Sequence, residues 1–455
     1  MKRGSKMDKQ NNNVIIEGVI WKQLLIFFFP ILVGTFFQQL YNTIDAVIVG
    51  QYVGKEALAA VGSTGSLINL IVGFFIGLSS GATVIISQFF GAKDDRLVSR
   101  AVHTAMALSI VGGLILMLIG IIFAPQALLL MGVPDEIMTY ATDYVRIYFL
   151  GMIPMMIYNM GSGILRAIGD SKRPLYFLII SCFVNIILDL VFVVLLKLEV
   201  VGVGIATSLS QVVSAILVFN VLVRSKETYR VIIKNIRFSM EDLVSIIRIG
   251  LPAGLQSVMY SISNIIIQAN VNSFGTNTIA AWATYAKIDT LFWMTMGAFG
   301  VAITTFVGQN YGAGKMDRVK KSVSVCLKMA LVVSLSLSLI LHFMAGIFSG
   351  FFTSDPEVIA LSTDIVRFLT QFYFCYICVE ILSGTIRGTG ESFIPMVITL
   401  FGTCAFRVIW ILLVVPHFGS FKMIEVCYPI SWALTSSLFI IYYFKGNWLT
   451  KNKAK

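Results

Sequence analysis

The stretch from Phe27 to Gly50, FFFPILVGTFFQQLYNTIDAVIVG, decides how the rest of the sequence is interpreted. It is long and apolar enough to cross a bilayer, for which a helix needs about 20 apolar residues. It nevertheless carries a carboxylate, Asp45, and a second apolar stretch, Asn185 to Val194, carries another, Asp189. An ionisable group in hydrocarbon is costly unless it is paired or hydrated. Asp45 and Asp189 are therefore predicted to belong to a polar site inside a membrane protein.

The composition of the whole chain indicates many membrane spans. Of its 455 residues 57% are hydrophobic and only 13% are charged, which exceeds the apolar content of ordinary soluble domains. We therefore predict an all-α polytopic membrane protein. Twelve stretches are candidate spanning helices, approximately 24–49, 58–87, 100–124, 137–164, 175–197, 202–223, 243–270, 279–308, 322–349, 358–386, 394–416 and 424–444.

The formal charge of +11 does not indicate a nucleic-acid partner, because the basic residues alternate between connections. One set of connections is rich in Lys and Arg, whereas the other tends to be acidic, as at Asp135–Glu136 and Asp355–Glu357. This is the pattern in which basic loops stay in the cytoplasm. It predicts a multi-pass protein of the cell membrane, inner or plasma, with both termini in the cytoplasm.

The sequence repeats itself at a fixed spacing, which predicts two equivalent halves. Motif residues at positions 88, 143 and 166 recur at positions 309, 364 and 387, always with the same offset, and Pro30 has a counterpart in Pro252, one position out of register. We expect two six-helix bundles related by a pseudo-two-fold axis along the membrane normal. The predicted divisions are a cytoplasmic tail 1–13, a bundle 14–224, a linker 225–239, a bundle 240–445 and a basic tail 446–455.

These features together resemble the multidrug and toxic compound extrusion (MATE) transporters of the multidrug, oligosaccharide-lipid and polysaccharide exporter superfamily. The resemblance covers nearly the whole chain. It rests on Pro30 followed by Gln38 to Asp45, on two related segments that begin at Gln88 and Gln309, and on the Arg-x-x-Gly segments at Arg166 and Arg387. It implies a twelve-helix fold of two bundles around a central cavity, and ion-driven export of varied organic compounds.

The resemblance also implies where the driving ion binds. In the branch that this sequence looks closest to, the coupling site lies in the N-terminal bundle and corresponds here to Asp45, Asn185, Asp189 and Thr207. Other branches place acidic coupling residues in helices 7 and 10. Helix 7 of this sequence, from Pro252 to Asn264, has no carboxylate, which disfavours that alternative.

The chemistry of these four residues fits a small cation or a proton. Asn185 and Asp189 are four residues apart, so they share one face of a helix. Carboxylate, amide and hydroxyl oxygens are the ligands that hard cations prefer, which makes Na⁺ possible at this site. Burial and a neighbouring carboxylate also favour a bound proton. The alternative is that both aspartates only hydrogen-bond and hold helices together.

Polar residues of helices 1 and 7 are too polar for contact with lipid and are predicted to line a substrate cavity. These are Gln38, Tyr41 and Asn42, with Gln256, Tyr260 and Asn264. Interhelical hydrogen bonding is the alternative role. Glu380 in helix 10 is added to the cavity because its place corresponds to that of Asn159, and an acidic residue there would favour cationic substrates. Lys287, Asp289 and Arg407 are expected to form intramembrane ion pairs.

We therefore predict a secondary active antiporter that exports organic cations, drugs or amphiphilic metabolites in exchange for H⁺ or Na⁺ by alternating access. It would need no cofactor, would work as a monomer in the lipid bilayer and would bind no nucleic acid. A lipid or oligosaccharide-lipid flippase of the same superfamily is the alternative. A membrane-embedded enzyme is a further alternative, but no catalytic pattern such as H-E-x-x-H is present.

Overall fold

The structure is a computed structural model that describes residues 14–449, and within this range the elements are helices joined by short turns and loops, with no strand. The predicted tail 1–13 and the last six residues of the tail 446–455 lie outside the described residues. Ten of the described helices are long and apolar enough to cross a membrane, and twelve spans result if each of two bent helix pairs counts as one. The prediction of an all-α protein with twelve spans is confirmed.

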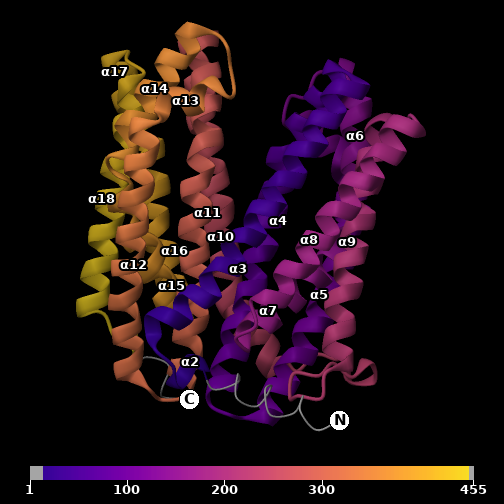
Figure 1. Cartoon of the computed structure of the whole chain (residues 1–455), viewed down its shortest axis with the longest axis vertical. Coiled ribbons are helices and arrows are strands. Elements are labelled where there is room, and N and C mark those ends of the chain that lie inside the picture. The colour runs from indigo at the N-terminus through magenta and orange to yellow at the C-terminus, as the bar shows by residue number, and fades with distance from the viewer. Residues whose placement is uncertain (1–13, 450–455) are drawn as a thin grey trace. The chain divides into compact units, whose positions relative to one another are not determined.

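The chain divides into two compact units, and the first comprises the described residues Phe29–Gly254. Figure 1 shows its helices in indigo to magenta. They are α3 (Ile20–Ile48, from Phe29 on), η1 (Val49–Val53), α4 (Lys55–Gly91), α5 (Asp95–Leu130), α6 (Asp135–Leu150), α7 (Met152–Ala167), α8 (Lys172–Asp189), η2 (Leu190–Leu195), α9 (Glu199–Arg224), η3 (Ile233–Asn235) and the start of α10 (Met240–Val271).

The second unit comprises the described residues up to Phe28 together with Leu255–Lys455 as far as residue 449. Its remaining helices are α2 (Val14–Glu17), η4 (Asn272–Phe274), α11 (Thr276–Gly312), α12 (Met316–Phe343), α13 (Ala345–Gly350), α14 (Pro356–Thr370), η5 (Tyr373–Tyr376), α15 (Ile377–Gly388), α16 (Phe393–Thr399), η6 (Leu400–Ala405), α17 (Phe406–Phe418) and α18 (Lys422–Lys445). In Figure 1 the helix α2 is indigo, and the helices of this unit from η4 on run from orange-red to yellow.

Within residues 14–449, both boundaries between the units fall inside helices. The first lies between Phe28 and Phe29 in α3, and the second lies between Gly254 and Leu255 in α10. Each of these helices therefore contributes its first part to one unit and its remainder to the other. The division at residues 225–239 stays a prediction about the sequence repeat, and it does not coincide with these packing boundaries.

Two predicted spans are broken. The span predicted at 137–164 consists of α6 and α7, which meet at Gly151 with a bend of 49°. Pro154 lies in the first turn of α7, where its missing N–H leaves no hydrogen bond unmade. The span predicted at 358–386 bends by 49° between α14 and the helical segment that starts at Tyr373. These breaks correct the prediction of two continuous helices.

Glycines allow α4 to pack directly against the backbone of α10 in the first unit. A Cβ atom added at Gly77 would overlap the backbone nitrogen of Gly254, and one added at Gly81 would overlap the carbonyl oxygen of Ile246. Gly250 is similarly enclosed by the backbone of Leu78. Small residues spaced four apart permit such close approach of membrane helices.

Near the equivalent sequence positions of the second unit, aromatic rings join α3 to α11. Phe28 in α3 stacks on Phe299 in α11, with ring centroids 4.1 Å apart. Around Pro30 and Pro252 the offset is 222, so Phe28 corresponds to Gly250. The motif at position 88 recurs at position 309 with an offset of 221, so Gly77 corresponds to Ala298, the neighbour of Phe299. The repeat therefore conserves a place for helix packing while changing the side chains that fill it.

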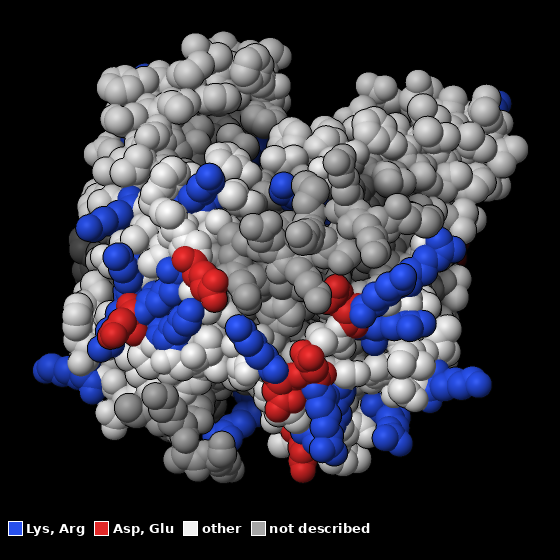
Figure 2. Space-filling view, turned by 60° about the horizontal axis from the view of Figure 1, so that its bottom comes forward, with Lys and Arg blue, Asp and Glu red and all other residues white. Residues whose placement is uncertain are grey.

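Lys and Arg side chains gather on the face of the protein that Figure 2 shows. In the first unit, Arg100 in α5 binds the start of α10 through Asp242. Its Nε lies 2.7 Å from Asp242 Oδ2 and its Nη2 lies 3.1 Å from Asp242 Oδ1, while Nη1 lies 2.8 Å from Glu241 Oε2. The Asp242 side chain is only 2% exposed. This two-point pairing fixes the beginning of α10 on α5.

In the second unit, a corresponding contact is made to backbone oxygens. Arg318 in α12 donates from Nε and Nη2 to the carbonyl of Ile15 at 3.2 and 2.9 Å, and from Nη2 to the carbonyl of Gly18 at 2.5 Å. Lys315 donates to the carbonyl of Ile16 at 3.2 Å. The segment that precedes α3 is thereby held to the start of α12.

Candidate functional site

The four residues predicted to bind the driving ion lie together in the first unit. Asp45 is on α3, Asn185 and Asp189 are on α8, and Thr207 is on α9. Asn185 and Asp189 are completely buried, and Asp45 and Thr207 are 5% and 4% exposed. Two carboxyl groups thus lie in the interior of one helix bundle.

The contacts within this cluster leave most of its oxygen atoms free. Thr207 Oγ1 donates to Asp45 Oδ2 at 3.3 Å, and both Asn185 and Asp189 lie within interacting distance of Asp45. Among the described residues, no hydrogen-bond partner is found for Asp45 Oδ1, for Asn185 Oδ1 or for either carboxylate oxygen of Asp189. Buried polar groups are almost always hydrogen-bonded. The cluster is therefore suited to hold a proton or a cation.

The local sequence explains how α8 and α9 present these groups. The spacing of four places Asn185 and Asp189 on one face of α8, and the π-helical turn η2 begins directly after Asp189. Such turns interrupt α-helices frequently at functional sites. Ser181 Oγ donates to the carbonyl oxygen of Ser210 at 2.7 Å, which fastens α8 to α9 near Thr207.

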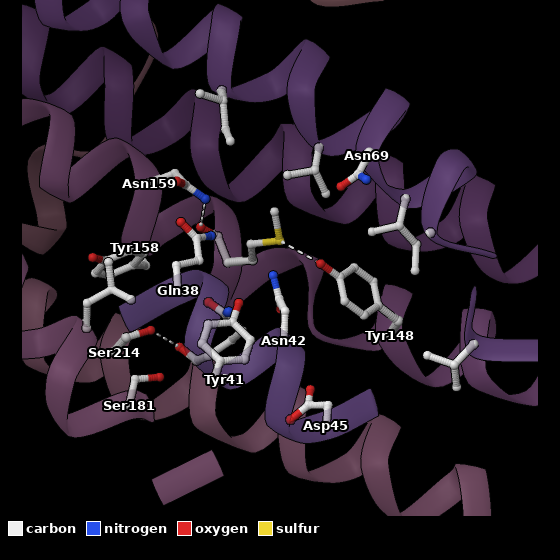
Figure 3. Close-up of a pocket in the computed structure, with 18 of the residues that line it drawn as sticks. Gln38, Tyr41, Asn42, Asp45, Asn69, Tyr148, Tyr158, Asn159, Ser181 and Ser214 are labelled. Atoms are coloured by element: carbon white, nitrogen blue, oxygen red, sulfur yellow. Dashed lines mark hydrogen bonds between the residues drawn. The ribbon is translucent and has the colours of Figure 1, made fainter. Parts of the chain in front are cut away.

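Asp45 also borders a cavity of about 270 Å³ inside the first unit. Figure 3 shows Gln38, Tyr41 and Asn42 of α3 around this space, as predicted from their polarity. Asp45 is the only charged residue that lines the cavity, and no Lys or Arg side chain of the described residues takes part. The role of these residues in binding a substrate stays a prediction.

Sequence reasoning missed much of the polar lining. The cavity also contains further side-chain amides and three further tyrosines, namely Asn69, Asn159, Gln211, Tyr144, Tyr148 and Tyr158. Asn159 Nδ2 donates to the carbonyl oxygen of Met155 at 3.0 Å, and Tyr158 donates to that of Pro174 at 3.2 Å. Amides inside apolar spans are the signal that could have identified Asn69 and Gln211, whereas Asn159 entered the sequence analysis only as the counterpart of Glu380.

The other predicted cavity residues belong to the second unit, and their surroundings differ. Gln256 is buried, donates to Thr399 Oγ1 at 3.0 Å and accepts from Arg387 Nη2 at 3.2 Å. Asn264 is exposed, whereas Tyr260 is half-buried. Gln256 thus has the interhelical bonding that was the alternative role.

Glu380 is half-buried within the second unit. Its Oε2 accepts from the hydroxyl of Tyr376 at 3.2 Å. A side chain at Gly300 would collide with Glu380, because an added Cβ would overlap its Oε1. The glycine therefore provides the space that this carboxylate occupies, and a part for Glu380 in binding a substrate stays a prediction.

The ion pairs expected among Lys287, Asp289 and Arg407 are absent from the described residues. Asp289 accepts instead from the Tyr373 hydroxyl and the Trp293 indole nitrogen, both at 2.6 Å. No carboxylate oxygen of the described chain lies within 4.0 Å of an Arg407 nitrogen, and Lys287 is exposed. Neutral aromatic donors satisfy Asp289, so it does not need a cationic partner.

Comparison with known proteins agrees with this architecture. A family model described as MatE matches residues 30–191 and, a second time, residues 252–413. The "Probable multidrug resistance protein YoeA" of Bacillus subtilis is 28% identical over 442 residues, covering 95% of each chain. The "Probable multidrug resistance protein NorM" of Thermotoga maritima is 25% identical over 454 residues, covering 96% of each chain.

Solved structures show the same fold. A MATE transporter crystallised in complex with MaL6 superimposes with a TM-score of 0.88 at 24% identity, covering 95% of this chain and 97% of the other. A MOP superfamily transporter from Pyrococcus furiosus gives a TM-score of 0.87 at 23% identity, covering 95% and 96%. With two family matches in one chain and the fold that they predict, this protein belongs to the MatE family of multi-pass membrane transporters and is not an enzyme.

Proposed function

We propose that the protein is a secondary active antiporter of the plasma membrane that exports organic cations, drugs or amphiphilic metabolites in exchange for H⁺ or Na⁺. The observation that carries this proposal is the set of buried oxygens without partners on Asp45, Asn185 and Asp189. Leaving such groups unsatisfied is costly, so a proton or cation that binds them gains a large part of that free energy.

The position of Asp45 suggests how the ion and the substrate affect one another. Asp45 belongs both to the buried cluster and to the wall of the cavity. A proton or Na⁺ at the cluster neutralises the single charge that lines this cavity. A cationic substrate would therefore bind better before the driving ion enters, and the ion would favour its release.

The cavity also argues against the alternative of an oligosaccharide-lipid flippase. The phosphate groups of a lipid-linked sugar are best bound by Arg or Lys. The described lining of the cavity consists of amides, tyrosines, hydroxyls, apolar residues and one carboxylate. This chemistry suits a cationic or neutral substrate with hydrogen-bonding groups, and aromatic rings can also bind a cation through their faces.

The test is the export of a fluorescent cationic dye from proteoliposomes, with the H⁺ and Na⁺ gradients imposed separately. We expect one gradient to drive export in the wild type, and we expect Asp45→Asn and Asp189→Asn to abolish it. Asp135→Asn is the matched control, because Asp135 is exposed at the start of α6 and lies outside the cluster. Normal transport by both buried variants would show that the two aspartates are only structural.

A further inference from the structure

In the second unit, the positions equivalent to the proposed ion site carry one positive charge and no negative charge. The two segments matched by the family model begin at position 30 and at position 252. In that register Arg407 corresponds to Asn185, and apolar Ile267 and Ile411 correspond to Asp45 and Asp189. No carboxylate remains at any of these positions. A cation site in the first half is thus matched by a guanidinium in the second.

The helix geometry supports this correspondence. Arg407 is on α17. The preceding motifs at positions 166 and 387 are 221 residues apart, whereas Asn185 and Arg407 are 222 residues apart, so the second unit needs one additional residue between the motif and Arg407. The π-helical turn η6 (Leu400–Ala405) lies just before Arg407, and a π-helical turn contains about one residue more than an α-helical turn. The inserted turn therefore supplies the extra residue.

The helices α18 of the second unit and α9 of the first unit contain the same kind of local hydrogen bond. On α18, Ser431 donates to the carbonyl of Tyr428 at 2.8 Å. On α9, Ser210 donates to the carbonyl of Thr207 at the same distance of 2.8 Å. Tyr428 and its neighbours thus take the place that Thr207 has in the first unit.

The surroundings of Arg407 leave part of its guanidinium group unsatisfied. The residue is only 3% exposed. Its Nε donates to Ser431 Oγ at 2.9 Å, and its Cζ lies 4.1 Å from the centre of the Tyr428 ring. Arg407 Nη2 is buried and has no hydrogen-bond partner among the described residues. A buried cation with an unused donor is unfavourable unless an acceptor reaches it.

A second unused donor lies in the same group of side chains. The ring of Trp432 packs beside that of Tyr428, with centroids 5.8 Å apart, and it is completely buried. Its indole nitrogen has no partner among the described residues. Asp289 attracts Arg407 from a distance, but both of its oxygens already accept bonds from Tyr373 and Trp293. The unused groups are therefore donors, whereas those of the first unit are mostly acceptors.

We propose that the interior of the second unit binds one anionic group, a halide or the carboxylate of a small organic acid, at Arg407. Nη2 of Arg407 supplies a charge-assisted hydrogen bond and the indole N–H of Trp432 supplies a neutral one. Ser431 and Tyr428 position the guanidinium group. This anion site lies in the second unit, whereas the proposed cation site lies in the first unit. Anion binding at Arg407 can therefore be measured in the absence of transport.

The experiment measures anion binding to the purified full-length protein in lipid nanodiscs. Bromide is titrated at constant ionic strength against a bulky sulfonate, and the melting temperature is recorded. We expect a saturable rise for the wild type. Arg407→Met should weaken bromide binding by about tenfold or more, as expected for loss of a charged hydrogen bond, and Arg407→Lys should retain part of it. Arg146→Met is the control, because Arg146 is on α6 of the first unit.

Two further variants keep the test decisive if Arg407→Met does not fold. Trp432→Phe retains an aromatic ring but removes the N–H, and it should weaken bromide binding several-fold. Asp289→Asn removes the nearby negative charge, and it should strengthen bromide binding. A purely structural role for Arg407 would give neither change, because no anion would be bound in any variant.

Competition separates the two sources of the anionic group. If benzoate displaces bromide while neutral benzamide does not, the site accepts an organic carboxylate. If bromide and chloride bind and benzoate does not compete, it is a halide site. No anion-dependent change of the wild type, or an equal change in Arg407→Met, would overturn the proposal. These outcomes are independent of dye export, so they can be told apart from failure of the proposed antiport.

Discussion

Thr207 connects α9 to α3 within the proposed ion site. Its hydroxyl on α9 donates to Asp45 on α3, while its backbone carbonyl accepts from Ser210. A threonine hydroxyl can donate to one group and accept from another. Thr207 can therefore bind Asp45 when that carboxylate is charged and can also offer a lone pair to a cation beside it.

We expect Thr207→Val to weaken the apparent affinity for the driving ion by about tenfold, because valine has a similar shape but no hydroxyl. Thr207→Ser keeps the oxygen and should behave nearly as the wild type. The measurement is the dependence of dye export on the concentration of the driving ion in proteoliposomes. Equal dependence in all three proteins would show that the hydroxyl does not contribute to ion binding.

At this scale the sequence identified charged residues better than neutral ones. Asp45 and Asp189 are conspicuous because a carboxylate in an apolar stretch is costly. Asn69 and Gln211 line the same cavity as Asp45, but an isolated amide is tolerated in a span and carries a weaker signal. Gln256 looked equally polar, yet it bonds to the side chains of two other helices. Hydrogen bonding between helices cannot be distinguished from cavity lining before the neighbours are known.

At the scale of elements, the crossing of α4 and α10 depends on glycines. We expect Gly77→Leu to destabilise the protein by about 1–3 kcal/mol or more, because even a Cβ atom would overlap the backbone of Gly254. Gly62→Leu is the matched control on α4, since a Cβ there meets nothing within 4 Å. Thermal unfolding in detergent measures the difference. Similar melting temperatures for the two variants would mean that the helices separate without cost.

The contact of Arg100 with α10 gives a second prediction for an element. Arg100→Ala leaves the buried carboxylate of Asp242 without its two donors, which should loosen the start of α10 and the preceding segment 225–239. Hydrogen exchange in this part of the chain should rise severalfold. Arg96→Ala, at a position on the same helix with no ion pair among the described residues, should leave exchange unchanged. Unchanged protection in Arg100→Ala would assign the stability of this segment to His103 and Thr104, which accept from its backbone at 3.0 and 3.1 Å.

The membrane-spanning helices could be predicted from the sequence, but the bends and π-helical turns within them could not. All twelve spans follow from apolar length, whereas the bends at Gly151 and before Tyr373 leave no break in hydrophobicity. The π-helical turns after Asp189 and before Arg407 are equally invisible, because they depend on packing. A single inserted residue changes the face of the helix on which a side chain lies, so Arg407 on α17 could not be placed from sequence spacing alone.

For the whole molecule, the distribution of Lys and Arg predicts the orientation. We expect a cysteine introduced at Ser354, beside the acidic segment 355–357, to react with a membrane-impermeant maleimide on intact cells. A cysteine at Lys226, in the basic linker, should react only after the cells are opened. The six native cysteines are buried or half-buried and should give a low background. The reverse pattern of labelling would place both termini outside.

The helices α3 and α10 have a practical consequence for dividing the chain. A fragment that ends at residue 224 would lack Gly250 and Gly254, so the exposed glycine surface of α4 would have nothing to cover it. The second fragment, starting at the linker, would lack Phe28 and leave Phe299 bare. When the two fragments are produced together, each should fold only if it binds the helix segment that the other one carries. Either fragment produced alone should be degraded by proteases.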